Sequence, residues 1–213
     1  MKKTYSTFYY ICGAILVMVL STLIFIVRDV QDDPRIVLDV SRIKGPINAP
    51  VHITEFSDFQ CPACSKGADI MHRLMEKYPY KIRISFNHFP LRMHPWAMIA
   101  HICAQCAAEQ GEYWPYHDLL FKYQKDWSTS KDPVLFFKEY AKKLNLDQNK
   151  FSSCVDTRAT EPVVVADAQK GRDEHINRTP TFIVNGERII GGDGLEERLD
   201  AQIRKILRLK EES

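Results

Sequence analysis

The sequence lacks an excess of charge of either sign, an internal repeat and any low-complexity tract. Its 29 Lys and Arg residues are interspersed with 27 Asp and Glu residues, so the net charge is only +2 and no basic stripe is present. A nucleic-acid-binding protein needs such a stripe, and we expect no nucleic-acid partner. The lack of a repeat excludes solenoids and propellers. What remains, with 45% apolar residues in 213, is the composition of one globular domain with an appendage.

One long uncharged run lies near the N-terminus, at residues 9–27 (YYICGAILVMVLSTLIFIV). A helix of this length spans roughly 28 Å at 1.5 Å per residue, so the run predicts a single transmembrane helix that anchors the chain. A cleaved signal peptide is the alternative, but its apolar region is only about 7–15 residues long and ends in small residues. This run ends in Val27 and Arg28, which favours the uncleaved anchor.

The charges on either side of the anchor predict its orientation. Lys2 and Lys3 precede it, and the positive-inside rule places residues 1–8 in the cytoplasm and the rest of the chain outside. The chain has six cysteines, and all but Cys12 follow the anchor; outside the cytoplasm they are interpreted as disulfides or redox groups before they are interpreted as metal ligands. Residues 28–42 are predicted to be a polar linker, followed by one domain at 43–213.

The domain begins with a strand, helix, strand pattern. Residues 51–56 and 81–86 alternate apolar and polar side chains and are rich in β-branched types, which predicts strands. Between them, Pro62 to about Tyr78 has helical periodicity, with Pro62 at a first-turn position where proline is tolerated. We therefore expect a βαβ unit with a right-handed crossover.

The middle of the domain, about 95–177, shows only helical periodicity. Helices are expected at 95–110, 112–123, 132–144, 147–156 and 161–176.

Strands return at 181–184 and 188–190, joined by Asn185-Gly186, the strongest short hairpin signal. An amphipathic helix at about 195–209 follows. Strands from both ends of the domain must share one sheet, so we predict an α/β, thioredoxin-like fold with an inserted helical domain, preceded by the transmembrane helix.

The sequence Cys61-Pro62-Ala63-Cys64 lies where a strand-like run meets a helix start. There, unpaired backbone amides and the helix dipole favour a thiolate and can lower a cysteine pKa from about 8.5 to roughly 3.5–7.5. A stabilised thiolate is a good leaving group, so a Cys61–Cys64 disulfide would be readily attacked by a substrate thiol. In this interpretation Cys61 is the exposed sulfur and Cys64 resolves the mixed disulfide.

A structural disulfide and half of a zinc site are the alternatives, because Cys103 and Cys106 form a second Cys-x-x-Cys. The two pairs are separated by 38 residues. That gap is far longer than the roughly 15–20 residues of a zinc ribbon, and the second pair lies within a predicted helix. We expect redox activity at Cys61 and Cys64 and no bound metal.

Several motifs in order resemble the DsbA-like branch of the thioredoxin superfamily, over about residues 43–209. They are Gly45-Pro46 through Val51, Glu55 through Cys64, Phe89-Pro90-Leu91 with His94-Pro95, Gly111 through Trp114, and Arg178 through Gly186.

The resemblance implies roles for three further residues. Thr179 and Pro180 match the family's cis-proline loop, which lies beside the active cysteines and pairs with a bound substrate chain; a plain turn or edge proline is the alternative. Glu55 matches the buried acid near the resolving thiol, where a raised pKa would let it exchange a proton with Cys64. A solvated surface glutamate is the alternative there.

A disulfide between Cys106 and Cys154 is also similar to one seen in some relatives. It would staple the helical block and stabilise it by roughly 4 kcal/mol in the chain-entropy model. Buried free thiols are the alternative. Cys103 and Cys106 are one helical turn apart, and side-chain directions in a helix oppose a bond between them.

His88, His94 and His101 with Met93 could indicate copper, but we interpret them as core or surface residues. Trp96, Trp114 and Trp127 are interpreted as packing residues of the helical block.

The resemblance implies a disulfide oxidase acting on unfolded or reduced secreted proteins and reoxidised by a quinone-linked partner in the membrane. We expect a monomer at the bacterial inner membrane, with a periplasmic or otherwise extracytoplasmic domain and no cofactor besides the Cys61–Cys64 pair. Ala63 replaces the histidine of the best-known members, which lowers the expected oxidising power. No dimerisation module accompanies the domain, which argues against an isomerase. A reductase in cytochrome or metal-site assembly and a copper or zinc chaperone remain alternatives.

Overall fold

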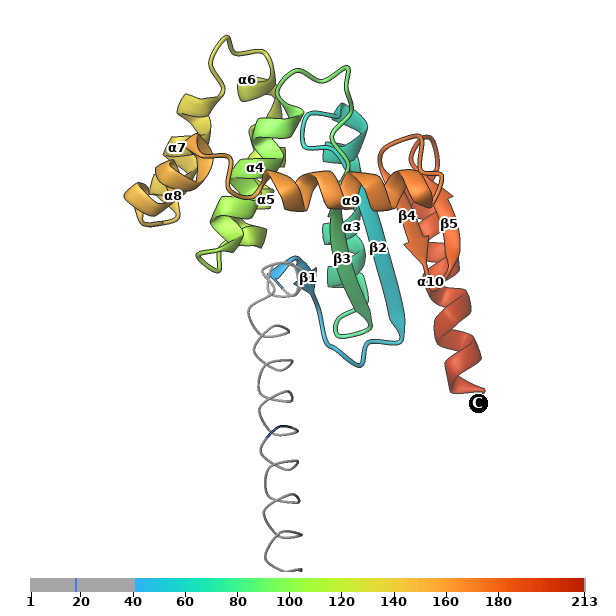
Figure 1. Cartoon of the computed structure of the whole chain (residues 1–213). Helices are drawn as coiled ribbons and strands as arrows, with labels where there is room; N and C mark the ends of the chain where they lie inside the picture. The colour runs from blue at the N-terminus through green and yellow to red at the C-terminus, as the bar shows by residue number, and fades with distance from the viewer. Residues whose placement is uncertain (1–17, 19–40, 213) are drawn as a thin grey trace, which may run out of the picture. The chain divides into compact units, whose positions relative to one another are not determined.

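The structure is a computed structural model that describes residue 18 and residues 41–212 (Figure 1). The predicted anchor, apart from Met18, and the predicted linker up to residue 40 lie outside the described residues. Within the part that is described, no helix combines the length and the apolar character needed to cross a membrane.

One mixed sheet organises the domain. Its strands are β1 (Ile43–Lys44), β2 (Val51–Ser57), β3 (Ile82–His88), β4 (Thr181–Val184) and β5 (Glu187–Ile190). Their spatial order is β1-β3-β2-β4-β5, in which β2 and β3 are parallel and the other pairs antiparallel. Helix α3 (Pro62–Lys77) connects β2 to β3, which confirms the predicted βαβ unit.

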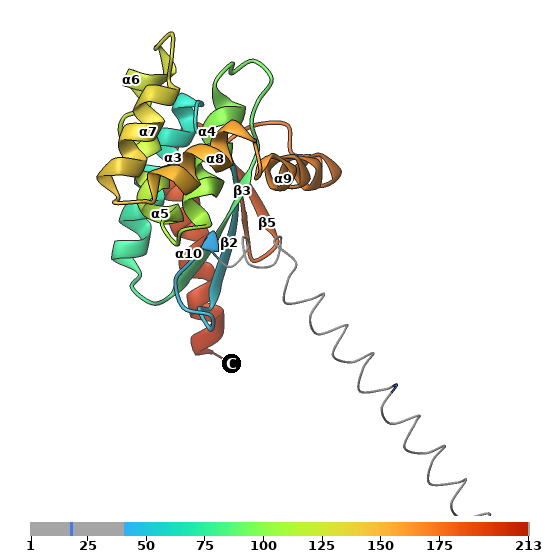
Figure 2. The same ribbon diagram turned by 60° about the vertical axis from the view of Figure 1, so that its left-hand side comes forward.

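Helices cover both faces of the sheet (Figures 1 and 2). On one face lie α3 and α10 (Leu195–Glu211), and Val51 and Ile53 of β2 join the same apolar cluster as residues of these two helices. On the other face lies α9 (Glu161–Asp173), where Phe56 packs with Ala168. Because side chains alternate along a strand, odd-numbered residues of β2 face α3 and even-numbered ones face away from it.

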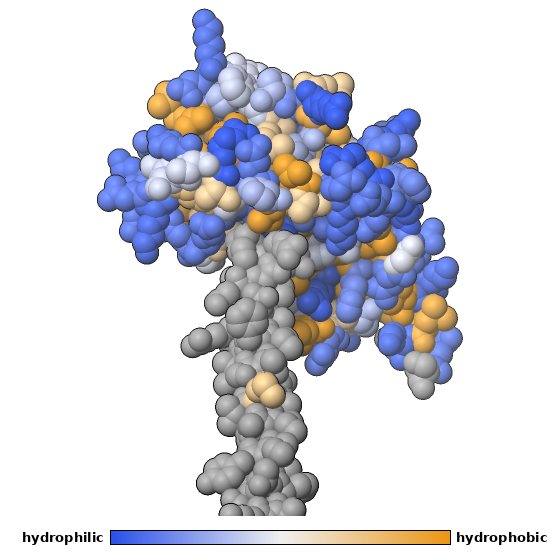
Figure 3. Space-filling view, in the orientation of Figure 1, coloured by the Kyte–Doolittle hydropathy of each residue, from blue (hydrophilic) through white to orange (hydrophobic). Residues whose placement is uncertain are grey.

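The outer surface on the α9 side is mainly polar. Figure 3 shows hydrophilic side chains over most of this face, with apolar side chains in small separate groups.

Most of the helical block predicted at about 95–177 lies together at one end of the sheet (Figure 1). This part consists of α4 (Ala97–Ala108), α5 (Tyr113–Lys122), α6 (Gln124–Ser128), α7 (Val134–Lys143) and α8 (Gln148–Asp156). The helix predicted at 161–176 is α9, which instead packs on a face of the sheet. The largest apolar cluster of the described residues joins this block to Phe59, Phe86, Cys61 and Cys64. The Cys-x-x-Cys sequence therefore lies where the sheet and the helical block meet.

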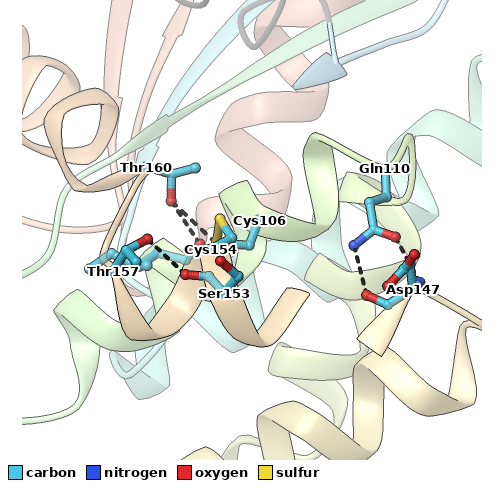
Figure 4. Close-up of a disulfide and its surroundings, with 8 residues drawn as sticks. Cys106, Gln110, Asp147, Ser153, Cys154, Thr157 and Thr160 are labelled. Atoms are coloured by element: carbon cyan, nitrogen blue, oxygen red, sulfur yellow. Dashed lines mark hydrogen bonds between the residues drawn. A yellow bond between two sulfur atoms is a disulfide. The ribbon is translucent and has the colours of Figure 1, made fainter. Parts of the chain in front are cut away.

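A disulfide joins α4 to α8 within the block (Figure 4). It links Cys106 to Cys154 with their Cα atoms 5.9 Å apart, and this is the pair that the resemblance implied. Nearby, Gln110 and Asp147 add two hydrogen bonds between the end of α4 and the start of α8. Cys103 is a buried free thiol.

The domain extends one residue beyond its predicted start at residue 43, where β1 begins and pairs antiparallel with β3 at the sheet edge. Arg42, the last residue of the predicted linker, is buried, donates to the Phe86 carbonyl and forms an ion pair with Asp167. Arg42 thus packs as part of the domain, because its planar guanidinium can satisfy both acceptors.

Candidate active site

Cys61 is the N-cap of α3, and Pro62 occupies the first helical position. Proline suits this place because its φ is already helical and it has no N–H that would need an acceptor. The backbone N–H groups of Cys64 and Ser65 both point back to the Cys61 carbonyl. Cys61 keeps 8% of its surface exposed, whereas Cys64, one turn into the helix, keeps none. The two thiols therefore have different access to a substrate.

The same geometry separates the two thiol pKa values. A hydrogen bond with Cys64 is the main cause that lowers the pKa of Cys61 to about 5, helped by Thr179 and by backbone N–H groups of the first turn. Burial raises the pKa of Cys64 well above its usual range, and the neighbouring Cys61 thiolate raises it further. At neutral pH the reduced pair thus holds one thiolate, on the exposed sulfur.

The Thr179–Pro180 loop lies against Cys61. Its peptide bond is cis, and the Thr179 carbonyl oxygen lies 3.7 Å from the Cys61 Sγ, within reach of a hydrogen bond when Cys61 is protonated. Two glycines make room for Pro180: a Cβ on Gly191 would come within 2.7 Å of its ring, and a Cβ on Gly67 of α3 within 3.1 Å. The predicted substrate-binding pair and the active cysteine are therefore neighbours.

Glu55 is buried in β2, with 1% of its surface exposed. Burial raises its pKa to about 7, partly offset by the Ser57 hydroxyl. The burial excludes the alternative of a solvated surface glutamate. A carboxyl group with this pKa can hold or release a proton near neutral pH.

Sequence reasoning missed the residues that hold the loop before Cys61. The Asp58 N–H donates to the Cys64 Sγ at 3.4 Å, and its buried carboxylate accepts from the backbone N–H groups of Gln60 and Leu91. The side chain of Gln124, at the start of α6, donates to the carbonyl oxygens of Phe59 and Cys61. Polar residues directly after an alternating strand, in the run Ser57-Asp58, were the available signal.

The model of the thioredoxin family Thioredoxin_4 matches residues 39–205. The chain belongs to the thioredoxin family. This is the superfamily that the sequence motifs indicated.

Solved structures show that this thioredoxin-family chain has a DsbA-like fold. Oxidised BdbD from Bacillus subtilis has a TM-score of 0.69 at 21% identity, covering 78% of this chain and 92% of that one. A thioredoxin-like oxidoreductase from Silicibacter pomeroyi has a TM-score of 0.67 at 18% identity, covering 83% and 98%. For α-DsbA1 from Wolbachia pipientis the TM-score is 0.66 at 21% identity, with coverage of 78% and 92%.

Curated relatives carry another name. The chain is 33% identical over 159 residues to "Na(+)/H(+) antiporter NhaA 3" of Salinispora tropica, and 31% identical to "Na(+)/H(+) antiporter NhaA 1" of Salinispora arenicola. The matches cover 74% of this chain and 24% of each antiporter. The chain thus spans about a quarter of the length of these relatives, and their name describes much larger proteins.

Two of the histidines considered for copper, His88 and His101, lie in the core of this thioredoxin-family domain. His88 and His101 are fully buried with their Nδ1 atoms 2.6 Å apart, and burial lowers both pKa values. His94 instead contacts the Asp58 carboxylate at 2.7 Å. Among the described residues, no group of three or more His, Cys, Asp or Glu side chains is arranged to hold a metal ion. Trp127 is fully buried and donates to the Leu120 carbonyl within the helical block.

Proposed function

We propose that the chain catalyses thiol–disulfide exchange and acts as an oxidant that forms disulfides in secreted or envelope proteins. The observation that carries this proposal is the contrast between the two thiols of the pair. Cys61 keeps 8% of its surface accessible and has a pKa of about 5, whereas Cys64 is fully buried and has a raised pKa. A low thiol pKa stabilises the reduced pair, and a pair that is stable when reduced oxidises other thiols.

In the oxidising step, a substrate thiolate attacks the Cys61 Sγ of the Cys61–Cys64 disulfide. The sulfur–sulfur bond of the pair breaks, a mixed disulfide forms, and Cys64 leaves as a thiolate that takes up a proton. A second substrate thiolate then attacks the substrate sulfur of the mixed disulfide and releases Cys61 as a thiolate. The substrate loses two electrons, which the Cys61–Cys64 pair gains.

Substrate backbone would bind beside Thr179, whose carbonyl oxygen lies 3.7 Å from the Cys61 Sγ. An extended peptide that pairs with the backbone at this position would bring its own thiol to Cys61. Binding through the backbone suits an enzyme that accepts many reduced or unfolded proteins.

We also propose that residues 9–27 anchor the chain in the bacterial inner membrane, with the N-terminus in the cytoplasm and the catalytic domain in the periplasm. A quinone-linked thiol oxidase in the same membrane would return the pair to its disulfide, and the chain would act as a monomer. The pair itself is then the only redox group that the chain needs.

The decisive experiment measures the reduction potential of the Cys61–Cys64 pair in the full chain, equilibrated in glutathione buffers. An oxidase with a thiol pKa near 5 should lie between about −270 mV, the value of thioredoxin, and about −120 mV, the value of DsbA. A value at or below about −270 mV would contradict the oxidase and support a reductase instead. Cys61→Ala, the matched control, should abolish exchange in either direction.

A further inference from the structure

In the proposed exchange reaction, on which this inference rests, the buried Cys64 sulfur needs a group that supplies its proton. When a substrate attacks Cys61, Cys64 leaves as a thiolate with none of its surface exposed. The backbone N–H of Asp58 donates to its sulfur, but an amide does not release its proton at neutral pH. Because burial makes the Cys64 thiolate unfavourable, a buried acidic group must supply the proton.

Two buried polar side chains of β2 lie on the correct side of the sheet. Glu55 and Ser57 are two residues apart and therefore share the face of Val51 and Ile53, which packs under α3, the helix that bears Cys64. Ser57 is the last residue of β2 and directly precedes Asp58, whose N–H contacts the Cys64 sulfur. Along the strand, Ser57 thus follows Glu55 in the direction of Cys64.

One polar atom of each of these two side chains has no hydrogen-bond partner. Ser57 Oγ and Glu55 Oε1 are both buried and have no hydrogen-bond partner among the described residues. Buried hydroxyl groups are almost always hydrogen-bonded, so an unpaired one at an active site calls for a role. Ser57 lies between Glu55 and Asp58 on the chain, and the N–H of Asp58 contacts the Cys64 sulfur. In agreement with this place, the Ser57 hydroxyl lowers the pKa of both Glu55 and Cys64.

We propose that the Ser57 hydroxyl passes the proton between Glu55 and Cys64. As the disulfide opens, the Ser57 hydroxyl proton moves to the departing Cys64 sulfur, and the Glu55 carboxylic acid restores the hydroxyl. Glu55 ends as a carboxylate, Cys64 as a neutral thiol and Ser57 unchanged. No electrons beyond those of the exchange itself are needed, and the proton returns along the same path when the pair is reoxidised.

Ser57→Ala tests the relay, measured as the rate at which dithiothreitol opens the Cys61–Cys64 disulfide of the full chain from pH 5 to 9. Dividing each rate by the thiolate fraction of the reductant leaves the contribution of the protein. In the wild type this corrected rate should fall above about pH 7, where Glu55 loses its proton. In Ser57→Ala it should be roughly tenfold lower at pH 6 and independent of pH, since general acid catalysis is lost.

Matched variants separate the relay from packing. Ser57→Thr keeps the hydroxyl on a strand position and should restore the wild-type pH profile. Ser85→Ala removes a hydroxyl from β3 that contacts Thr54 on the opposite side of the sheet, and its profile should equal that of the wild type. Ser57→Ala should fold normally, because removing a hydroxyl without a partner leaves no other polar group unsatisfied.

Three results would overturn the relay. They differ in whether they also contradict the role of Glu55 or the proposed function. If Ser57→Ala keeps the wild-type rate and profile while Glu55→Gln loses them, the proton reaches Cys64 without Ser57. If both variants match the wild type, Glu55 is not the acid either, although exchange at Cys61 stands. If dithiothreitol opens no Cys61–Cys64 disulfide in the wild type, the proposed function itself fails.

Discussion

The chemistry of single residues in the pair depends on how the start of α3 distributes exposure. Cys61 has access to solvent, helix N–H groups and a hydrogen bond from Cys64, so its charged form is stabilised. Cys64 contacts Cys61 from the buried side and has no access to water, so its charged form is unfavourable. A single helical turn thus yields a leaving group and a resolving thiol from identical side chains.

The lowered pKa of Cys61 makes the stability of the reduced chain depend on pH. Its thiol has a pKa of about 5 in the folded chain, against about 8.5 when unfolded. The thiolate therefore contributes stability that is fully present above about pH 8.5 and is lost as the pH falls toward 5. Between these limits, the free energy of unfolding should rise by at most about 1.4 kcal/mol per pH unit from this one group.

Urea unfolding of reduced wild type and reduced Cys61→Ser at several pH values measures this contribution. The wild-type free energy of unfolding minus that of the variant should increase with pH from 5 to 8. Glu55, whose raised pKa gives the opposite trend between about pH 4.5 and 7, is present in both proteins and cancels. A difference that stays constant with pH would show that Cys61 has an ordinary thiol pKa.

Residue roles were predictable from the sequence only where a local pattern or a motif carried them. Cys61 follows from the Cys-x-x-Cys at a helix start, and Pro180 from its motif. The support by Asp58 and Gln124 was not predictable, because it includes contacts between residues 33 or more positions apart, that of Asp58 with Leu91 and those of Gln124 with Phe59 and Cys61. Ser57 lies within the motif from Glu55 to Cys64, but the motif implied no role for it, and its significance comes from burial without a partner.

At the scale of elements, the close packing of α9 against the sheet depends on Gly171. A Cβ at this position would lie 2.6 Å from the ring of Phe89 and 3.1 Å from that of Phe56. Gly171→Ala should therefore destabilise the domain by about 1–3 kcal/mol through overpacking, although alanine favours helices by about 1 kcal/mol. Val165→Ala, at an exposed position of the same helix, is the control and should change the stability by less than about 0.5 kcal/mol.

Thermal melts of the two variants decide the point. If Gly171→Ala melts at or above the wild-type temperature, the ring of Phe89 moves aside without cost and α9 is not held by this close contact.

The Cys106–Cys154 disulfide ties α4 to α8 across a sequence separation of 48 residues. Closing a loop of this length restricts the unfolded chain and should contribute about 4 kcal/mol. The double variant Cys106→Ala, Cys154→Ala should lose about this much in urea unfolding under oxidising conditions. Under strong reductant, the gap between wild type and variant should nearly vanish. Equal unfolding midpoints under oxidising conditions would argue that the staple does not stabilise the block.

Elements that carry a periodic pattern or a turn signal were predictable, and the shortest elements, which carry neither, were not. The bounds of β4 and the hairpin at Asn185-Gly186 match the sequence pattern. Strand β1 has two residues and α6 has five, both too short for a period to show. Their places depend on tertiary contacts, the pairing of β1 with β3 and the hydrogen bonds of Gln124.

At the scale of the whole molecule, the Cys61–Cys64 pair lies between the sheet and the helical block, which come from different segments of the sequence. The sheet supplies Glu55 and the Thr179–Pro180 loop from opposite ends of the domain, and the helical block buries the inner side of the pair. The strand register fixes the position of Glu55 relative to the Thr179–Pro180 loop, since Glu55 lies directly opposite Phe182 on β4. Sequence patterns predicted the two parts and the shared sheet but not which side chains would meet.

The orientation that we propose for the chain in the membrane rests on the charges on either side of residues 9–27 and can be tested through Cys61. Among the described free thiols, Cys61 alone keeps part of its surface accessible, 8%, and has a low pKa, since Cys64 and Cys103 are fully buried. After mild reduction of cells whose outer barrier has been opened, a membrane-impermeant maleimide should label the wild-type chain but not Cys61→Ala. Alkaline carbonate washing should leave the chain in the membrane fraction, because about 20 apolar residues insert stably. Labelling that requires rupture of the inner membrane would place the domain in the cytoplasm, where the proposed oxidase would meet a reducing glutathione pool and could not stay oxidised.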